Sequence, residues 1–398
     1  MTLFSVTQHG REYRVKKLLS DAGRFGQIYV AEDGADPTRH YAVKVLSLTS
    51  ESKKAIQREA TVMVCALLTP PKTHNDLPLP HEPTLLYSHQ QKLAGHPNIV
   101  KLEAFFTVAG TGGNDAVFVM ELCDGGSLLD VLNARAPRPF PEADLLSVFL
   151  EVCTGVAFMH SQKPPIAHRD IKVCFPPHTC KWNRAQGHAH AHAHVRTQIE
   201  NVLRKGRTWK LCDFGSATTS AGVARDERTR QLMADDIERN TTMTYRAPEM
   251  CDLFRKQLVC EKADIWALGC MLYKMAFFAD AFEDGTLQIL NNRWSVPRTS
   301  PFSPRLHDLI RFMLEPDPAR RPHIGLVCER TAQLLNRPNP VPVCAHTPSP
   351  SFPLLSSASL TTASPVCARV DRTLCRTTTV QRCRARPVLL GVRQHLQQ

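Results

Sequence analysis

The sequence predicts an α+β chain of two lobes, a strand-rich N-terminal lobe with an antiparallel sheet and a larger, mainly helical C-terminal lobe. Two patterns predict this order. Strand-like patterns recur near the N-terminus, at 13–19, 27–31 and 41–46. Apolar residues at helical spacing follow later in the chain, at 143–160, 263–277 and 304–314. Because ligands bind preferentially where two such units meet, we expect the functional site to lie between the lobes.

Composition bounds the class of protein. With 398 residues, of which 43% are hydrophobic, the chain can bury a sizeable core. Residues 1–15 lack the basic start and apolar run of a signal peptide, and the apolar stretches, such as 265–273, are too short to span a bilayer. The 14 cysteines show no framework spacing, so we expect reduced thiols. These features favour a cytoplasmic protein without a transmembrane segment, and they predict no oligomeric state.

The same reading predicts three parts of the chain: an N-terminal extension at 1–10, a folded domain at 11–336 and a disordered tail at 337–398. The tail is rich in Pro, Ser, Thr and Arg and cannot bury enough apolar area to fold. Its basic end, from Cys367 to Gln398, could touch nucleic acid or an acidic membrane surface. A merely solvated tail explains it as well, and we expect no nucleic-acid partner.

Two glycines lie between the first two strand patterns of the domain. Gly23 and Gly26 could let backbone amides approach phosphate oxygens closely. An ordinary hairpin turn would show the same residues, and Asp21 or Ser20 stands where a first glycine is usual. The pattern is therefore a weak indication of a phosphate-binding loop.

A lysine in the third strand pattern is a stronger indication. Lys44 lies in a strand interior, where a lysine is unusual unless its ammonium meets phosphate and a carboxylate. Glu59, in a helix-like segment, is the candidate carboxylate.

Three short motifs follow in order: His-Arg-Asp at 168–170, Asp-Phe-Gly at 213–215 and Ala-Pro-Glu at 247–249. Asp170 could accept the proton of a substrate hydroxyl, and Lys172 could neutralise the phosphoryl group in transit. Asp213 is a candidate ligand of Mg²⁺, a hard ion that prefers oxygen. Together the motifs predict ATP and Mg²⁺ as cofactors and transfer of the γ-phosphate to a protein hydroxyl.

With these motifs, residues 11–336 resemble the protein kinase superfamily. The segments at 244–250, 262–270 and 314–322 are similar to the Numb-associated kinase family, which includes adaptor-associated and cyclin-G-associated kinases and actin-regulating fungal relatives. The resemblance implies the bilobal kinase fold with a C helix, and serine/threonine specificity. It also implies a role in clathrin-coated vesicle traffic or actin patches, with clathrin adaptor subunits as substrates and peripheral association at coated vesicles or the cell cortex.

The resemblance also implies roles for individual residues. Met120 would be the gatekeeper, and Glu121 to Cys123 would form the hinge that pairs with adenine. Leu203 would lie beneath the base. The other roles are support of the catalytic loop by Asp264, steadying of the catalytic residues by Thr242, pairing of Glu249 with Arg321, Mg²⁺ binding by Asn201, and nucleotide contacts of Ile28 and Ala42.

Two segments interrupt the expected domain. Kinases place the metal-binding asparagine five residues after the catalytic aspartate, whereas Asp170 and Asn201 are 31 positions apart. Removing the 26 residues at 173–198 restores that spacing, and removing 64–90 joins the C helix to the next strand. Both segments begin with Val-Cys and end with Gln. Valine codons begin with GT and a glutamine codon can be CAG, so the coding sequence of each segment could begin and end with ordinary splice signals. We interpret them as candidate non-native insertions from an unspliced gene, and the tail from Val343 as a third candidate.

Two alternatives remain open. The segment at 173–198 could bind metal through its histidines and cysteines, although these lack the paired spacing of a structural zinc site: His188, His190, His192, His194, Cys174 and Cys180. The chain could also be a catalytically impaired pseudokinase or scaffold, because the inserted loop could displace Asn201. The presence of Lys44, Asp170, Asn201 and Asp213 favours an active enzyme.

Overall fold

The computed structural model of the chain describes residues 2–8, 10–21, 26–49, 52–64, 93, 95–110, 113–136, 138–173, 201–283 and 285–341. The chain divides into two units, Met1–Ala345 and His346–Gln398, and every described residue belongs to the first. Gly23, most of both candidate insertions and the chain beyond 341 lie outside the described residues.

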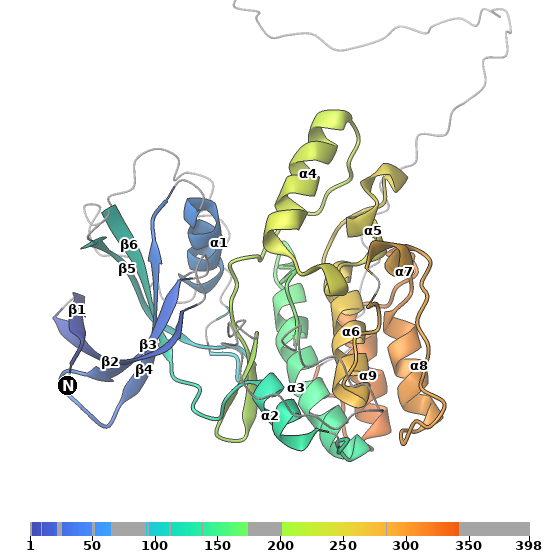
Figure 1. Ribbon diagram of the computed structural model, residues 1–398, viewed down its shortest axis with the longest axis horizontal. Coiled ribbons are helices and arrows are strands. Elements are labelled where there is room, and N and C mark those ends of the chain that lie inside the picture. The colour runs from blue at the N-terminus through green and yellow to red at the C-terminus, as the bar shows by residue number, and fades with distance from the viewer. Residues whose placement is uncertain are drawn as a thin grey trace, which may run out of the picture. The chain divides into compact units, whose positions relative to one another are not determined.

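The N-terminal lobe is built on a six-stranded antiparallel sheet with the order β1-β2-β3-β4-β6-β5 (Figure 1). Its strands are β1 Phe4–Gln8, β2 Arg11–Asp21, β3 Gln27–Asp33, β4 His40–Ser47, β5 Leu102–Gly110 and β6 Gly113–Glu121. The three strand patterns predicted from the sequence fall in β2, β3 and β4. The structure adds β1, an edge strand within residues 1–10, outside the predicted bounds of the domain.

The two faces of this sheet carry different apolar clusters. Val43 and Val119 belong to a small cluster on one face. Phe118 belongs to the main core together with Ile56 of α1, which spans Ser52–Val64 and is the predicted C helix. Because alternate residues of a strand point to opposite faces, the α1 side of the sheet is the side of Phe118.

The strand register places the predicted nucleotide-binding residues on that same side. Lys44 is paired with Ile28 of β3 and Phe118 of β6, and Ala42 is paired with Met120. Since cross-strand partners share a face, these side chains project together toward the α1 side of the sheet.

The C-terminal lobe is mainly helical. Its helices are α2 Leu128–Arg135, α3 Glu142–His160, α4 Glu227–Asn240, α5 Pro248–Cys251, α6 Lys262–Phe277, α7 Thr286–Leu290, α8 Pro304–Met313 and α9 Ile324–Leu334, with short 3₁₀ turns at Met243–Tyr245 and Leu253–Arg255. Strands β7 Val202–Lys205 and β8 Thr208–Leu211 form a separate hairpin. The three helical patterns predicted from the sequence correspond to α3, α6 and α8. Helix α4, which lies between the Asp-Phe-Gly and Ala-Pro-Glu motifs, is an addition of the structure.

The α3 helix is long and apolar enough, by length and composition, to cross a membrane. The sequence predicts no such stretch, so this is a difference between expectation and structure. Eleven of its residues are buried, and it packs against α6 and α9. This environment is that of a core helix, whose apolar residues face protein on several sides.

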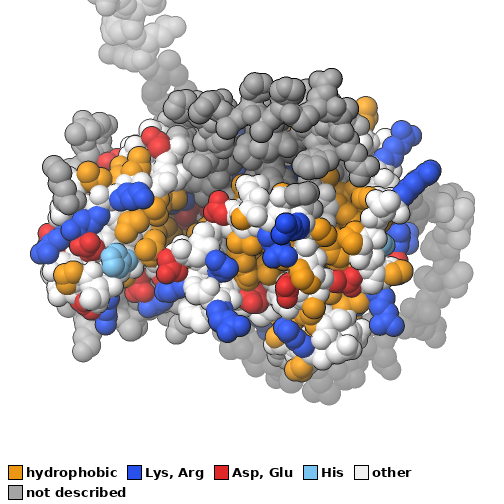
Figure 2. Space-filling model, turned by 60° about the horizontal axis from the view of Figure 1, so that its bottom comes forward, with side chains coloured by type: hydrophobic (Ala, Val, Ile, Leu, Met, Phe, Trp, Pro, Cys, Tyr) orange, Lys and Arg blue, Asp and Glu red, His pale blue; other side chains and the backbone are white. Residues whose placement is uncertain are grey.

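One face of the molecule shows its charged side chains intermixed. Figure 2 shows Lys and Arg side chains spread among Asp and Glu over the described residues of that face, without one continuous basic patch.

Candidate active site

A buried ion cluster joins the two lobes. The Lys44 ammonium on β4 donates to both carboxylate oxygens of Glu59 on α1, at 2.9 and 2.8 Å, and to Asp213 Oδ1 at 3.1 Å. The side chains of Lys44 and Glu59 are 4% and 3% exposed. The predicted pairing of Lys44 with Glu59 is thus present, and Asp213 joins it from the C-terminal lobe.

The cluster contains one cation and two carboxylates, which sets its electrostatics. Burial alone would lower the pKa of Lys44, but the charges of Asp213 and Glu59 outweigh it and raise that pKa. Burial raises the pKa of Glu59 against the pull of Lys44. Burial would also raise the pKa of Asp213, yet Lys44 lowers it overall. Asp213 is therefore the carboxylate that stays most firmly ionised.

The catalytic loop is held from below by a buried carboxylate. Asp264 on α6 accepts hydrogen bonds from the backbone N–H groups of His168 and Arg169, both at 2.7 Å, and contacts His160 Nε2 at 2.9 Å. Arg169 has a φ of 67°, a left-handed conformation that is costly for a residue with a side chain. The two bonds to Asp264 stabilise this backbone turn, as predicted for Asp264.

The candidate base is oriented by two neighbours. Thr242 Oγ1 donates to Asp170 Oδ1 at 2.8 Å, and Lys172 Nζ donates to Asp170 Oδ2 at 2.7 Å and to Thr242 Oγ1 at 3.1 Å. The three side chains form a closed triangle. The structure thus brings the three predicted catalytic residues into contact with one another.

Asn201 lies beside the base in spite of the long intervening segment. Its Nδ2 donates to the Asp170 carbonyl at 2.5 Å and approaches Asp170 Oδ2 at 3.3 Å. The sequence raises the possibility that residues 173–198 displace Asn201; in the structure the asparagine stays in contact with Asp170. Backbone pairing of β7 with β8 starts at the next residue, Val202, and fixes the position.

The surroundings of Asn201 and Asp213 fit a bound Mg²⁺. Asn201 Oδ1 is buried and has no hydrogen-bond partner among the described residues. Such an orphaned acceptor is costly unless something else binds it. Amide and carboxylate oxygens are the ligands that Mg²⁺ prefers, and Asn201 and Asp213 would supply one each.

The remaining nucleotide-binding candidates occupy separate positions. Ile28, Ala42 and Met120 share the Lys44 face of the sheet. Leu203 lies on β7, bridged to Ser127. Cys123 follows β6 and is partly buried.

Glu121 and Gly26 lie at two edges of the predicted nucleotide site. The Glu121 carboxylate binds the Lys205 and Lys210 ammonium groups and the Lys101 N–H, which lower its pKa although burial would raise it. Gly26 has a φ of 83°, and a Cβ there would collide with the Val45 carbonyl. The backbone therefore requires glycine at 26, whereas Gly23 lies outside the described residues.

A second buried ion pair supports the C-terminal lobe. The Arg321 guanidinium binds both oxygens of Glu249 at 2.8 Å, and both side chains are fully buried. Its remaining N–H groups donate to backbone carbonyls, including those of Glu315 and Lys262. The predicted pairing of these two residues is present.

The sequence does not single out one further group of charges. Arg58 on α1 and Arg169 in the catalytic loop both bind Asp236 of α4. The helix itself has a sequence signal, because Asp226 precedes it as an N-cap and accepts from Thr229 N–H at 2.8 Å. The partners of Asp236 have no such signal, since they lie 178 and 67 positions away.

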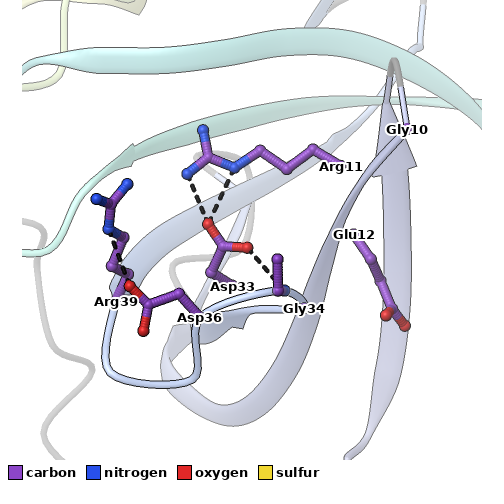
Figure 3. Close-up of a pocket in the computed structure, with 8 residues that line it drawn as sticks. Gly10, Arg11, Glu12, Asp33, Gly34, Asp36 and Arg39 are labelled. Carbon is purple, nitrogen blue, oxygen red and sulfur yellow. Dashed lines mark hydrogen bonds and ion pairs between the residues drawn. The ribbon is translucent and has the colours of Figure 1, made fainter.

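A separate cavity lies away from this cluster. A cavity of about 680 Å³ is lined by residues at the start of β2 and the turn after β3, and Figure 3 shows two ion pairs in its lining, Arg11 with Asp33 and Arg39 with Asp36. It shares no residue with the cluster of Lys44, Asp170 and Asp213. We place the active site at the cluster of Lys44, Asp170 and Asp213, where the residues that can carry phosphoryl transfer lie together, and not at this cavity.

Comparison with known proteins agrees with this geometry. The family model of the protein kinase domain matches residues 86–174 and 187–333. A probable serine/threonine-protein kinase of Dictyostelium discoideum is 38% identical over 323 residues, which cover 80% of this chain and 33% of the relative. The actin-regulating kinase PRK1 of Saccharomyces cerevisiae is 38% identical over 231 residues, 56% of this chain and 25% of the relative.

A second probable serine/threonine-protein kinase of Dictyostelium discoideum is 33% identical over 321 residues, 79% of this chain and 24% of the relative. The chain thus spans about a third or less of the length of these curated relatives. The chain belongs to the protein kinase family, and its fold and relatives are those of serine/threonine protein kinases.

Proposed function

We propose that this chain transfers the γ-phosphate of ATP to serine or threonine hydroxyls of other proteins. One observation carries the proposal: Lys44 and Asp213 converge in one buried cluster, and Asn201 contacts Asp170 beside them. A decayed site usually loses at least one of these four residues. The arrangement therefore favours an active kinase over the pseudokinase alternative.

The residues divide the work of transfer. Asp170, held at both oxygens by Thr242 and Lys172, is oriented to accept the proton of an incoming hydroxyl. Lys172 brings a positive charge to the same point, where negative charge develops on the phosphoryl group. Lys44 would hold the α- and β-phosphates while Glu59 fixes its ammonium. When bound by Asn201 and Asp213, Mg²⁺ supplies the charge that neutralises the phosphate oxygens.

A transfer assay with labelled ATP and a threonine-containing peptide tests the proposal. Asp170→Asn should lower the rate by about 10²- to 10⁴-fold while ATP affinity by calorimetry stays the same, because positioning survives when the base is lost. The matched control is Asp308→Asn, the same change at an exposed site on α8. Equal loss of rate and affinity, or phosphotyrosine as the main product, would refute the assignment.

For the cellular role we propose actin regulation or clathrin-coated vesicle traffic, with clathrin adaptor subunits among the substrates. The support is the likeness to an actin-regulating kinase and the resemblance of three segments to Numb-associated kinases. The protein would act in the cytoplasm, at coated vesicles or the cell cortex, with peripheral membrane association. Phosphorylation of purified adaptor subunits, compared with Asp170→Asn, tests this role.

We also propose that residues 64–90 and 173–198 are absent from the mature protein. The support is the restored spacing in the sequence; closing a loop of this length costs on the order of 3 kcal/mol. Deleting both should raise the melting temperature. Deleting 173–198 should raise the rate if that segment displaces Asn201 from Asp170, and the gain should be small if their contact persists in solution. Sequencing the spliced transcript decides whether the segments are encoded.

A further inference from the structure

Two arginines from distant parts of the chain meet at one carboxylate, that of Asp236. Asp236 of α4 accepts from Arg169 Nη1 through Oδ2 at 2.5 Å, and from Arg58 Nη2 through Oδ1 at 2.5 Å. The Arg169 side chain is only 8% exposed, whereas Arg58 and Asp236 are each 30% exposed. One carboxylate thus links α1, the catalytic loop and the segment between the Asp-Phe-Gly and Ala-Pro-Glu motifs.

The position of Asp236 is fixed by its own helix. Asn240 Nδ2, one turn later, donates to Asp236 Oδ1 at 3.0 Å and to its carbonyl at 2.9 Å. Ile237, the residue after Asp236, is 4% exposed and packs into the main core. Arg246 Nε donates to Thr241 Oγ1 at 2.7 Å, just after the helix end. Helix α4 is therefore anchored at the turn that carries Asp236.

Each arginine sits next to a residue of the active site. Arg58 precedes Glu59, and residues one apart on a helix point about 100° apart. The same stretch of α1 therefore points Glu59 at Lys44 and Arg58 at α4. Arg169 precedes Asp170, and its Nε donates to the Ser216 carbonyl at 2.7 Å, close after the Asp-Phe-Gly motif. Fixing both arginines fixes the rotation of α1 and the setting of the base.

The burial of Arg169 indicates that the Asp236 carboxylate is needed to balance its charge. Without Asp236, a nearly buried guanidinium would lose its ion-pair partner, and breaking such a pair is costly. Burial would raise the pKa of Asp236, but the charge of Arg169 and hydrogen bonds from both arginines lower it, so it is ionised at neutral pH.

In many kinases a phosphate on this segment fills such an arginine cluster and orders it. Here the hydroxyls nearby have other partners. Thr242 binds Asp170, Thr241 donates to the Ile237 carbonyl, and Thr229 donates to Asp226. No serine or threonine hydroxyl of residues 213–249, all of which the structure describes, is bonded to Arg58 or Arg169 in it.

We propose that Asp236 is a positioning residue that takes the place of a phosphate, so that the active arrangement forms without phosphorylation of residues 213–249. It acts through Arg58 on Glu59 and through Arg169 on Asp170. The inference rests on the proposed phosphoryl transfer and adds how the same site is kept in its active geometry.

The test compares Asp236→Asn with Asp235→Asn, the same change one residue earlier, where the carboxylate accepts a hydrogen bond from the Gln231 side chain of the same helix. After phosphatase treatment the wild-type chain should keep its rate. Asp236→Asn should lose about 10- to 100-fold in kcat, the range that a small misplacement of catalytic groups costs. Asp236→Glu should recover most of it, and Asp235→Asn should be unchanged.

A second readout does not need activity. Hydrogen exchange should quicken in α1 and the catalytic loop of Asp236→Asn but not of Asp235→Asn, and the increase should be largest in these two elements. Loss of wild-type activity on phosphatase treatment, or equal exchange in the two variants, would overturn the inference. If the wild-type chain transfers no phosphate at all, the proposed function fails, and the exchange comparison still decides whether Asp236 positions the two elements.

Discussion

Two groups of buried charges in this kinase differ in their charge balance. Glu249 and Arg321 form a balanced pair, one charge against one, with two matched hydrogen bonds and no side-chain exposure. Lys44 faces two carboxylates, Glu59 and Asp213, and leaves negative charge in excess. The Arg321 guanidinium of the balanced pair also donates to backbone carbonyls and lies over the Trp266 ring.

The difference separates support from catalysis. A pair that is balanced and fully bonded has nothing left to offer a ligand, so its role is to hold α6 and the Ala-Pro-Glu segment together. A cluster with surplus negative charge is electrostatically unfavourable by itself, and a bound cation would neutralise the excess. An unfavourable charge balance at a catalytic site is a common case in which stability is lost in exchange for function.

The largest expected effect is on the balanced pair. Arg321→Leu should lower the free energy of unfolding by about 3–5 kcal/mol, because it leaves the Glu249 carboxylate buried without a partner. Urea unfolding measures the change. The double variant Arg321→Leu with Glu249→Leu should recover much of the loss; if it does not, packing by the guanidinium matters more than charge.

The second effect concerns the free energy of unfolding, whose dependence on pH should change sign in the acidic range when Lys44 is replaced by Met. The pKa of Asp213 is lowered in the folded chain, so its contribution to stability is present above its ordinary value of 3.8 and is lost as pH falls through the lower folded value. In Lys44→Met, burial and the neighbouring Glu59 carboxylate are unopposed, and the folded pKa values should rise.

A raised carboxyl contributes stability below its unfolded pKa and loses it as pH rises through the folded value. The unfolding free energy of Lys44→Met should therefore fall as pH rises above the ordinary values of 3.8 and 4.5, relative to the wild-type chain. Urea unfolding at several pH values measures this. Parallel profiles would show that Lys44 does not control the ionisation of the cluster. ATP binding should also weaken in this variant.

Sequence reasoning reached the motifs because catalysis needs particular residue types in a particular order. Lys44, Asp170 and Asp213 carry that order, and the structure brings them together. Strands and helices with a regular apolar period were also predictable, as β4 and α6 show. What the sequence could not predict are contacts that depend on tertiary packing, such as the pairing of Asp236 with Arg58, which lies 178 positions away.

The edge strand β1 shows the same limit. Its five residues are mostly exposed, and only Val6 is buried, so the apolar pattern is too weak to predict a strand. Backbone pairing with β2, a property of the assembled sheet, makes it one. The insertions illustrate the reverse case, in which spacing along the chain suggested a displacement of Asn201 that the assembled β7–β8 hairpin does not show.

The smallest expected effect is the most direct test of the comparison. Asp213→Asn removes one of the two carboxylates that share Lys44, and leaves a balanced pair with Glu59. Asparagine tolerates the left-handed backbone that Asp213 adopts at a φ of 62°, so the turn should survive. The free energy of unfolding should stay the same or rise by about 0.5–1 kcal/mol.

Transfer should nevertheless be lost, and addition of Mg²⁺ with ATP should no longer raise the melting temperature as it does for the wild-type chain, because the variant lacks a ligand to the ion. The matched control is Glu249→Gln, the same carboxylate-to-amide change in the balanced pair, which should lower stability. If Asp213→Asn were destabilised as much as Glu249→Gln, surplus charge would carry no cost at this site. The active cluster would then differ from the supporting pair in its position alone, and not in its electrostatics.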